Sequence, residues 1–498
     1  MYFLGIDLGS SSIKVSVLDA DKGKIICAVT VPEFEMEISA PKFDWAEQNP
    51  DTWWGYVKEG LNEVSKKHNI DLKKVNGIGI AYQMHGLVLT DENLEPVRPS
   101  IIWCDSRAVE IGNDALEAIG KENCHRQILG SPGNFTASKL KWVKQNEPEV
   151  YAKAKYMMLP GDYIAAKLSG VPQTTTSGLS EAALWDFPKG KLALEVLEKM
   201  GLSEDYIPEI VPSFGHQAKV SKEIASELGL NPDAVITYRA GDQPNNALSL
   251  NVLNPGEIAT TAGTSAVIYA VTDKDNYDEQ NRVNTFLHVN NNEDQKRNGI
   301  LGIINGSGIL YQWLRKTISL GNDELISYEL LNREAAKVPA GSDGLRFYPF
   351  GNGAERIFNN KKVNSGIENL NFNIHQPPHL IRSACEGIVF AMNYGFDVMK
   401  SLGTSGEVVR AGKGNLFLSP VFREIFCNTT QANLELYNTS GAEGAARGAA
   451  YGYGYFSNLD EAFGELEIVE RIEPDKNLSS QYQEIYSEWK ENIKIEKE

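Results

Sequence analysis

Short apolar runs and amphipathic segments alternate along most of the chain. Residues 77–82 and 234–238 are rich in β-branched and other apolar side chains and predict buried strands. Segments 53–67, 136–146 and 162–168 carry apolar residues at helical spacing. Because strands alternate with amphipathic helices, the pattern predicts an α/β architecture with partly parallel sheets.

Two β-rich hairpins stand about half the chain apart. The first runs from residue 3 to 18 around a Gly-Ser-Ser-Ser turn at residues 9–12, and the second runs from 257 to 271 around a Gly-Thr-Ser turn at residues 263–265. A repeat of this size predicts two related domains that each open with a hairpin, rather than a solenoid. A chance likeness between two hairpins is the alternative.

Turn residues place the domain boundary between the hairpins. The alternation of apolar strands and amphipathic helices is interrupted over residues 245–256, where an Asn-Pro-Gly turn precedes the second hairpin. We therefore predict an N-terminal domain over 1–250 and a C-terminal domain over 251–498. The last stretch, 481–498, has mixed charge at helical spacing and predicts a solvated surface helix.

Composition narrows the class of protein. The chain has 498 residues, with 48 Lys and Arg against 66 Asp and Glu and a formal net charge of −18. This acidity opposes nucleic acid or an anionic membrane as the main partner, so small ligands are expected. No apolar run approaches the roughly 18 residues of a membrane helix, and the N-terminus does not resemble a signal peptide. Five scattered cysteines without a CxxC pair fit reduced thiols, so we expect a cytoplasmic protein.

Both hairpin turns are candidate phosphate sites. The Walker loop, the GxGxxG fingerprint and the HExxH zinc motif do not occur in the sequence, so a nucleotide site must be built differently. The turn at residues 9–12 offers consecutive backbone N–H groups and three hydroxyls, which suits a polyphosphate, and the turn at 263–265 can act in the same way. Taken alone, each turn is also typical of an ordinary hairpin.

Two carboxylates lie at the ends of apolar strands. Asp7 directly precedes the first turn, where a carboxylate needs hydrogen bonds or a cation, and Mg²⁺ bound to phosphates would supply that cation through water. Asp242 follows the strand at 234–238, where it can take a proton from a substrate hydroxyl. In each case a turn-capping or ordinary loop aspartate is the alternative.

Two further segments carry unusual side chains. Gln83, Met84 and His85 end the strand at 77–82 and combine an amide, a thioether and an imidazole, which suits a polyol. A structural histidine is the alternative. Residues 441–450 are small for a helix, which indicates that something approaches the backbone closely, either a packed neighbour or a nucleotide.

Together these motifs resemble the FGGY family of carbohydrate kinases over nearly the whole chain. The matching segments are residues 6–12, 83–86, 103–107, 136–142, 159–163, 241–242, 263–265 and 382–387. The resemblance implies an α/β, two-domain actin-like ATPase (ribonuclease H-like) fold with an active-site cleft between the domains. It also implies ATP and Mg²⁺ as cofactors, a small-molecule sugar as partner, no nucleic-acid or membrane partner, and a possible homodimer.

The resemblance assigns roles residue by residue. Asp242 matches the catalytic base, and Asp7 matches the aspartate that supports activity near Mg²⁺. The positions expected to bind the sugar, all in the N-terminal domain, are Met84, His85, Asp105, Arg107, Asn134, Asp242 and Gln243. The positions expected to bind the nucleotide are Gly9, Ser10, Ser11, Ser12, Lys14, Gly263, Thr264, Gly308, Gly412 and Asn415. The stretch 411–415 departs from the family's usual glycine motif.

The pocket motifs narrow the choice of sugar. Met84, His85 and the Leu-Pro-x-Asp-Tyr stretch at 159–163 resemble the family members that phosphorylate D-xylulose to D-xylulose 5-phosphate. Those members usually have Asn where this chain has Gln243, which is closer to the glycerol-phosphorylating members. Other acceptors, such as L-ribulose, L-fuculose or glycerol, therefore stay open. A non-kinase ATPase on the same scaffold is a further alternative, although it would need neither the polar cluster at 83–85 nor a catalytic aspartate.

Overall fold

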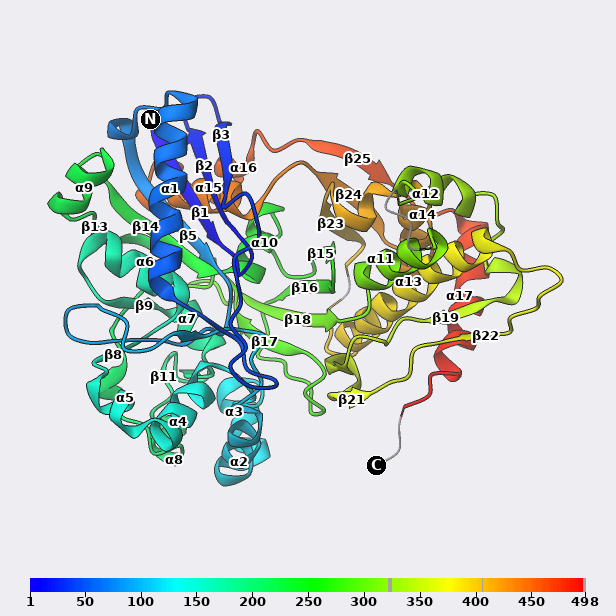
Figure 1. Ribbon diagram of the computed structural model, residues 1–498, viewed down its shortest axis with the longest axis horizontal. Coiled ribbons are helices and arrows are strands. Elements are labelled where there is room, and N and C mark those ends of the chain that lie inside the picture. Colours follow the sequence, from blue (N-terminus) through cyan, green and yellow to red (C-terminus); the bar gives the residue numbers. More distant parts are fainter. Residues whose placement is uncertain (321–324, 405, 496–498) are drawn as a thin grey trace. The chain divides into compact units, whose positions relative to one another are not determined.

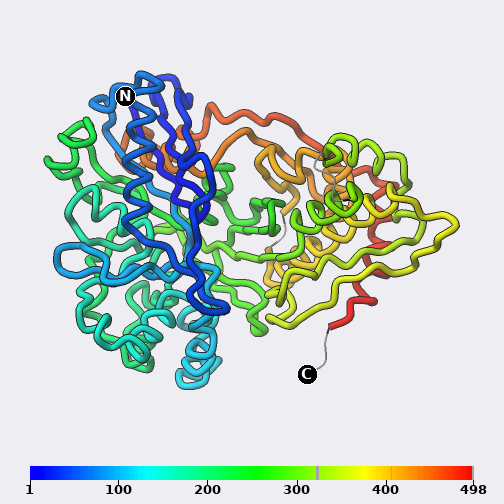
Figure 2. The backbone as a smooth tube through the Cα atoms, viewed as in Figure 1, coloured from blue at the N-terminus to red at the C-terminus, as the bar shows by residue number. Residues whose placement is uncertain are grey.

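The computed structural model describes residues 1–320, 325–404 and 406–495 (Figure 1). Contacts divide the chain into two compact units, and the path of the chain through them can be followed in Figure 2. Unit 1 comprises Met1–Asn251, Phe286–Asn298 and Thr439–Leu466, and unit 2 comprises Val252–Thr285, Gly299–Asn438 and Glu467–Glu498. The predicted division at residue 250 therefore leaves out two later segments that return to unit 1.

Unit 1 is built on a six-stranded sheet in the order β13-β14-β5-β1-β2-β3. Its strands are β1 (Tyr2–Leu8), β2 (Ile13–Asp19), β3 (Lys24–Val31), β5 (Val75–Tyr82), β13 (Phe214–Lys219) and β14 (Val235–Gly241). Strands β1 and β2 form the predicted antiparallel hairpin. Strand β5 pairs in parallel with both β1 and β14. Three neighbouring parallel strands therefore end at the same edge of the sheet.

The two faces of this sheet are covered differently, because successive side chains of a strand point to opposite faces. Leu4, Ile6 and Leu8 of β1 belong to an apolar cluster with residues of α1 (Pro50–His68) and α6 (Pro160–Ser169). Phe3 instead packs in a second cluster with alanines of α15 (Gly441–Tyr453). In Figure 1, α15 lies beside β1 and β2. The helices expected over 53–67, 136–146 and 162–168 are confirmed.

Helix α15 approaches the sheet so closely that the strands need glycine. A Cβ atom on Gly5 would lie 1.8 Å from the Ala442 carbonyl oxygen, and one on Gly79 would lie 2.1 Å from the Ala445 carbonyl oxygen. Of the two explanations for the small residues at 441–450, close helix packing is confirmed. The same contacts explain why the segment Thr439–Leu466 belongs to unit 1.

Unit 2 has a seven-stranded sheet in the order β17-β18-β16-β15-β23-β24-β25. Its strands are β15 (Ile258–Ala262), β16 (Ala266–Thr272), β17 (Asn284–Leu287), β18 (Asn298–Ile304), β23 (Val408–Gly412), β24 (Asn433–Tyr437) and β25 (Ile468–Ile472). Strands β15 and β16 form the second predicted hairpin, and β23 pairs in parallel with β15 and with β24. Each unit thus opens with a hairpin, as the repeat predicted, and adds two further parallel strands.

The last helix differs from its prediction. Helix α17 (Lys476–Glu491) buries Tyr482, Tyr486 and Trp489 in the core of unit 2, which also contains α13 (Pro377–Ser401). The indole N–H of Trp489 donates to the Phe347 carbonyl at 2.9 Å. The prediction of a solvated helix is therefore wrong, because charges between the aromatic residues hid an apolar face. Residues 496–498 of the predicted span lie outside the described residues.

The remaining elements connect and cover the two sheets. The other helices are α2 (Val109–Ile119), α3 (Lys121–Ile128), α4 (Thr136–Asn146), α5 (Pro148–Lys153), α7 (Thr176–Glu181), α8 (Leu194–Lys199), α9 (Lys222–Leu228), α10 (Asp242–Ser249), α11 (Gly308–Ile318), α12 (Tyr328–Ala335), α14 (Pro420–Thr430) and α16 (Leu459–Phe463). Short strands are β4 (Glu47–Gln48), β6 (Val88–Thr90), β7 (Ser100–Ile101), β8 (Tyr156–Met158), β9 (Gln173–Thr175), β10 (Trp185–Asp186), β11 (Lys191–Leu192), β12 (Glu209–Val211), β19 (Arg346–Tyr348), β20 (Ala354–Glu355), β21 (Lys361–Lys362) and β22 (Gly366–Glu368). None of the helices in the described part of the chain is long and apolar enough to span a bilayer.

Candidate active site

The parallel strands of unit 1 bring three predicted positions to one edge. Asp7 is the penultimate residue of β1, Gln83 follows β5, and Asp242 follows β14 as the first residue of α10. All three line a cavity of about 280 Å³. The other lining residues are Gly9, Ser10, Ser11, Ser12, Lys14 and Trp103. The first phosphate turn and the proposed base therefore share one cavity.

The environment of Asp242 changes its acidity. Burial and the nearby charge of Asp7 raise the pKa of Asp242 to about 7, although hydrogen bonds from Gln243 act in the opposite direction. Burial also raises the pKa of Asp7, against the lowering effect of Lys14. A carboxyl group whose pKa lies near 7 is suited to accept a proton at neutral pH.

Gln48 holds the first turn and Gln83 in place. Its Nε2 donates to the Ser10 carbonyl at 2.7 Å and to the Glu37 carbonyl at 3.2 Å. Its Oε1 accepts from the indole of Trp53 at 3.1 Å and from Nε2 of Gln83 at 3.3 Å. Because the two carbonyls only accept and the indole only donates, the orientation of the Gln48 amide is fixed, and that of Gln83 follows from it.

Met84 lies beside the proposed base, and His85 follows it in the chain. A Cβ atom on Gly241 would come within 2.5 Å of Met84 Cγ, so the methionine packs directly against the residue before Asp242. His85 has a left-handed backbone with φ of 61°. Its Nδ1 lies 3.1 Å from the Glu181 carbonyl, which only accepts, so this nitrogen carries the proton. Main-chain contacts therefore set the direction of the imidazole.

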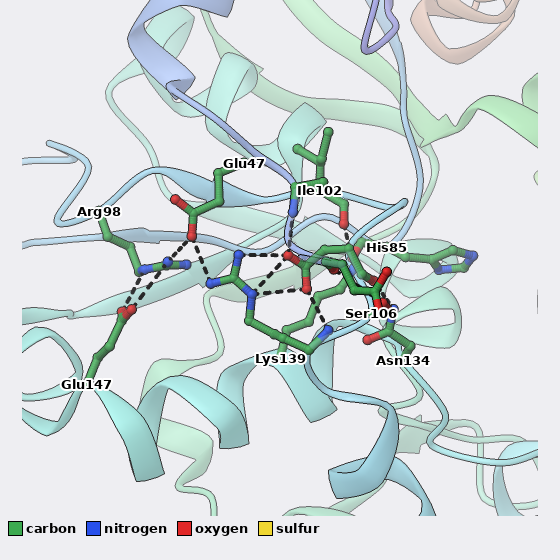
Figure 3. A network of polar contacts seen from close by, with 12 residues as sticks. Glu47, His85, Arg98, Ile102, Ser106, Asn134, Lys139 and Glu147 are labelled. Atoms are coloured by element: carbon green, nitrogen blue, oxygen red, sulfur yellow. Dashed lines mark hydrogen bonds and ion pairs between the residues drawn. The ribbon is translucent and has the colours of Figure 1, made fainter. Parts of the chain in front are cut away.

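Asp105, Arg107 and Asn134 belong to a buried polar network (Figure 3). Nη2 of Arg107 lies 2.7 Å from Oδ2 of Asp105, and Nη1 lies 2.8 Å from Glu47. The guanidinium lies 3.8 Å from the centre of the Trp45 ring. Asn134 donates to the Asp105 carbonyl. Asp105 and Arg107 thus neutralise each other, and their contact with a sugar stays a prediction.

Two buried titratable groups lie beside the loop after β5, which contains His85, and the loop 102–107 after β7. Neither group received a role in the sequence analysis. Lys139, in α4, donates to main-chain carbonyls of both loops, and burial lowers its pKa to about 7. Burial and the charge of Asp242 raise the pKa of Glu181 well above its usual range. Lys139 occurs in the segment 136–142 that carries the family resemblance, whereas no pattern in the sequence marks Glu181.

Unit 2 contains a second cavity, of about 350 Å³, at the second turn. Four predicted nucleotide positions line it, namely Gly263, Thr264, Gly308 and Asn415. The other lining residues are Ala262, Ile309, Tyr311, Gln312, Tyr328, Asn332, Leu416, Leu418 and Ser419. Gly412 is not one of the described lining residues, and it ends β23 three residues before Asn415.

The shape of this cavity suits a nucleotide. The backbone N–H of Gly308 donates to the Gly263 carbonyl at 2.8 Å, and a Cβ atom on Gly308 would lie 2.4 Å from that oxygen. Tyr311 and Tyr328 stack with ring centres 5.8 Å apart, and the Tyr311 hydroxyl donates to Asn332 at 2.7 Å. Aromatic faces and an amide are groups that bind a purine base. No pattern in the sequence marks these three residues, which lie on α11 and α12, far along the chain from the turn at 263–265.

The cavity of unit 1 also fits a hydrated divalent cation. Mg²⁺ prefers oxygen ligands and keeps several of its waters. Asp7 and Asp242 supply carboxylate oxygens, and their mutual repulsion is relieved by a cation. In the described part of the chain, no group of three or more His, Cys, Asp or Glu side chains could hold a metal. The residues therefore suit a cation that arrives with the phosphates of a nucleotide.

Family models decide between the alternatives left open by the sequence. The model of the N-terminal domain of the FGGY family of carbohydrate kinases matches residues 2–249, and the model of its C-terminal domain matches residues 258–455. The chain belongs to the FGGY family of carbohydrate kinases. The predicted family is confirmed, and the non-kinase ATPase alternative is set aside.

Individual relatives of this FGGY kinase agree with the family models. The chain is 28% identical to xylulose kinase from Bacillus subtilis over 98% of its own length and 97% of the relative. It is 26% identical to gluconokinase from the same organism, over 97% of this chain and 93% of the relative. A crystal structure of xylulose kinase from Rhodospirillum rubrum superposes with a TM-score of 0.88 at 22% identity, covering 99% of this chain and 98% of the other. That structure confirms the predicted two-domain α/β fold.

Proposed function

We propose that this FGGY kinase transfers the γ-phosphoryl group of ATP to a terminal hydroxyl of D-xylulose, which yields D-xylulose 5-phosphate and ADP. The observation that carries the proposal is the cavity shared by Asp242, Asp7 and the first turn. The likeness to xylulose kinases and the Met84-His85 pair beside Asp242 support the choice of sugar.

Asp242 acts as the general base in this proposal. Its carboxylate takes the proton of the sugar hydroxyl, the hydroxyl oxygen forms a bond to the γ-phosphorus, and the bond from that phosphorus to the bridging oxygen of ADP breaks. The residues that bind and orient the sugar are Met84, His85, Asp105, Arg107, Asn134 and Gln243. Because phosphoryl transfer needs little covalent help from the protein, orientation and electrostatics supply most of the acceleration.

ATP is held by the two turns and by the unit 2 cavity. Backbone N–H groups and hydroxyls of the turn at 9–12, with Lys14, bind phosphate oxygens. Gly263, Thr264, Gly308, Gly412 and Asn415 bind the rest of the nucleotide, with Tyr311, Tyr328 and Asn332 at the base. Asp7 would hold a Mg²⁺ ion that arrives with ATP, and this cation would supply positive charge beside the transferring group.

A panel of acceptors tests this proposal. ADP release is measured with ATP and Mg²⁺ on D-xylulose, L-ribulose, D-ribulose, L-fuculose, glycerol and gluconate, with a control lacking sugar. Gluconate is included because a gluconokinase is among the relatives. We expect the highest kcat/KM with D-xylulose. A clear preference for another acceptor would reassign the substrate, and equal ADP release with and without every acceptor would contradict the proposal.

The pH dependence of catalysis follows from the pKa of Asp242. A raised pKa means that the carboxyl becomes protonated, and loses its ability to act as a base, as the pH falls through about 7. We therefore expect kcat/KM for the sugar to fall about tenfold per pH unit below pH 7 and to level off above it. A profile measured at saturating Mg-ATP from pH 5.5 to 8.5 checks this. A flat profile down to pH 5.5 would rule out Asp242 as a base with this pKa.

A further inference from the structure

One buried lysine bonds to both loops that carry the proposed sugar-binding residues (Figure 3). Nζ of Lys139 donates to the His85 carbonyl at 2.7 Å and to the Ile102 carbonyl at 3.0 Å. His85 lies in the loop after β5, and Ile102 begins the loop 102–107 after β7. A single amine on α4 therefore bonds to both chain segments, which are also linked by main-chain hydrogen bonds between Leu87 and Ile101.

Burying a lysine side chain at position 139 is energetically unfavourable. Lys139 is 0% exposed, and removing an ammonium group from water is unfavourable unless charges and hydrogen bonds compensate. The nearby charge of Asp105 favours the ammonium, and that of Arg107 opposes it. An apolar side chain would fill the same volume without this cost. The N–H donors of the Lys139 amine, rather than its bulk, are therefore the property that distinguishes this position.

The backbone of His85 explains what the ammonium does. A left-handed conformation is unfavourable for a non-glycine residue, so it persists only where surrounding contacts hold it. At His85 the carbonyl is held by Lys139 and the ring nitrogen Nδ1 by the Glu181 carbonyl. Loss of Lys139 removes one of the contacts that hold this conformation, so the peptide after His85 is expected to shift and redirect the imidazole.

We propose that Lys139 is a positioning residue for the sugar. It fixes the main chain at His85 and at Ile102 and so sets the distance between the two sugar-binding loops, without touching the sugar itself. The inference rests on the proposed function, because it concerns the site assigned there to the acceptor. The class of ligand is a polyol or ketose whose hydroxyls span both loops.

The test replaces Lys139 by Met, which keeps the length of the side chain and removes the ammonium. Lys144→Met is the matched control, because Lys144 lies on the same helix and also donates to a main-chain carbonyl, that of Gly201, but is exposed. For Lys139→Met we expect the KM for the sugar to rise about ten- to a hundredfold. The KM for ATP should stay within a factor of about three, and Lys144→Met should match wild type.

A double-mutant cycle separates positioning from a general loss of structure. If Lys139 acts through His85, Lys139→Met should weaken sugar binding much less in a His85→Ala background than in wild type. Lys139→Gln, which keeps an N–H donor, should fall between wild type and Lys139→Met and serves if Lys139→Met does not fold. Sugar binding measured by calorimetry without ATP provides a readout independent of turnover.

The outcomes separate failure of this inference from failure of the proposed function. An unchanged sugar KM in folded Lys139→Met, or additive effects in the cycle, would overturn the positioning role while leaving the kinase activity in place. A parallel loss of sugar affinity, ATP affinity and melting temperature would also overturn it, because that result indicates a structural role. Wild-type protein without sugar-dependent turnover would remove the proposed function, and this inference with it.

Discussion

Asp242→Asn is expected to lower kcat for sugar phosphorylation by about 10³-fold. The amide keeps the size and the hydrogen-bonding oxygen of the carboxylate but cannot take the proton of the attacking hydroxyl. ATP binding should stay within a factor of about three, because the nucleotide is proposed to bind mainly at other residues. Steady-state turnover on the best acceptor, together with calorimetry for ATP, measures both quantities.

The stability of Asp242→Asn shows whether turnover is lost because the base is missing or because the protein unfolds. The raised pKa means that the folded protein binds the proton more tightly than the unfolded chain, so ionisation of Asp242 reduces stability as the pH rises from about 4 to about 7, and the full loss remains above that pH. We therefore expect Asp242→Asn to be at least as stable as wild type at pH 8. Asp233→Asn, at an exposed aspartate paired with Lys219, is the matched control for turnover. Near-normal kcat in folded Asp242→Asn would contradict the assignment of the base.

Gly5→Ala is expected to destabilise the protein by about 4 kcal/mol or more, or to prevent folding. The added Cβ atom would lie 1.8 Å from the Ala442 carbonyl oxygen and 2.4 Å from the Ala446 nitrogen. Both are main-chain atoms within α15, so the whole helix would have to move away from β1. The midpoint of urea unfolding, followed by far-UV circular dichroism, measures the effect.

Gly55→Ala is the control for the Gly5 substitution. Gly55 lies in the exposed face of α1, and apart from its chain neighbours and the adjacent helical backbone, no atom lies within 4 Å of the Cβ position. Alanine should therefore leave stability unchanged or raise it by up to about 1 kcal/mol, because glycine is unfavourable inside a helix. A wild-type unfolding midpoint in Gly5→Ala would show that α15 does not pack on β1 as closely as described.

Local patterns in the sequence were sufficient to predict the elements but not their order in space. The hairpins at β1–β2 and β15–β16 follow from apolar runs around short turns, and both are confirmed. The return of Thr439–Leu466 to unit 1 could not be predicted, because it depends on glycines 5 and 79 making room for a helix more than 350 residues away. The aromatic face of α17 was missed because polar residues separate its members, namely Gln483, Glu484, Ser487 and Glu488.

In the candidate site, too, single residues could be predicted from the sequence but their arrangement in space could not. Asp7 and Asp242 could be chosen from the sequence because each lies at the end of an apolar strand. Their meeting in one cavity depends on β1 and β14 flanking β5 in parallel, a strand order that no local pattern contains. Lys139 and Glu181 were given no role, since a charged side chain on a short helix is normally exposed. Their burial follows from packing that only the three-dimensional structure shows.

The most direct test of the central claim is the identity of the phosphorylated product. Wild-type protein is incubated with Mg-ATP and D-xylulose, and the reaction is followed by ³¹P nuclear magnetic resonance, with Asp242→Asn in parallel. We predict that the γ-phosphate signal of ATP is replaced by that of a sugar phosphate ester, in step with ADP, and that Asp242→Asn forms no detectable ester on the same timescale. Release of inorganic phosphate without any ester, or equal ester formation by Asp242→Asn, would contradict the account.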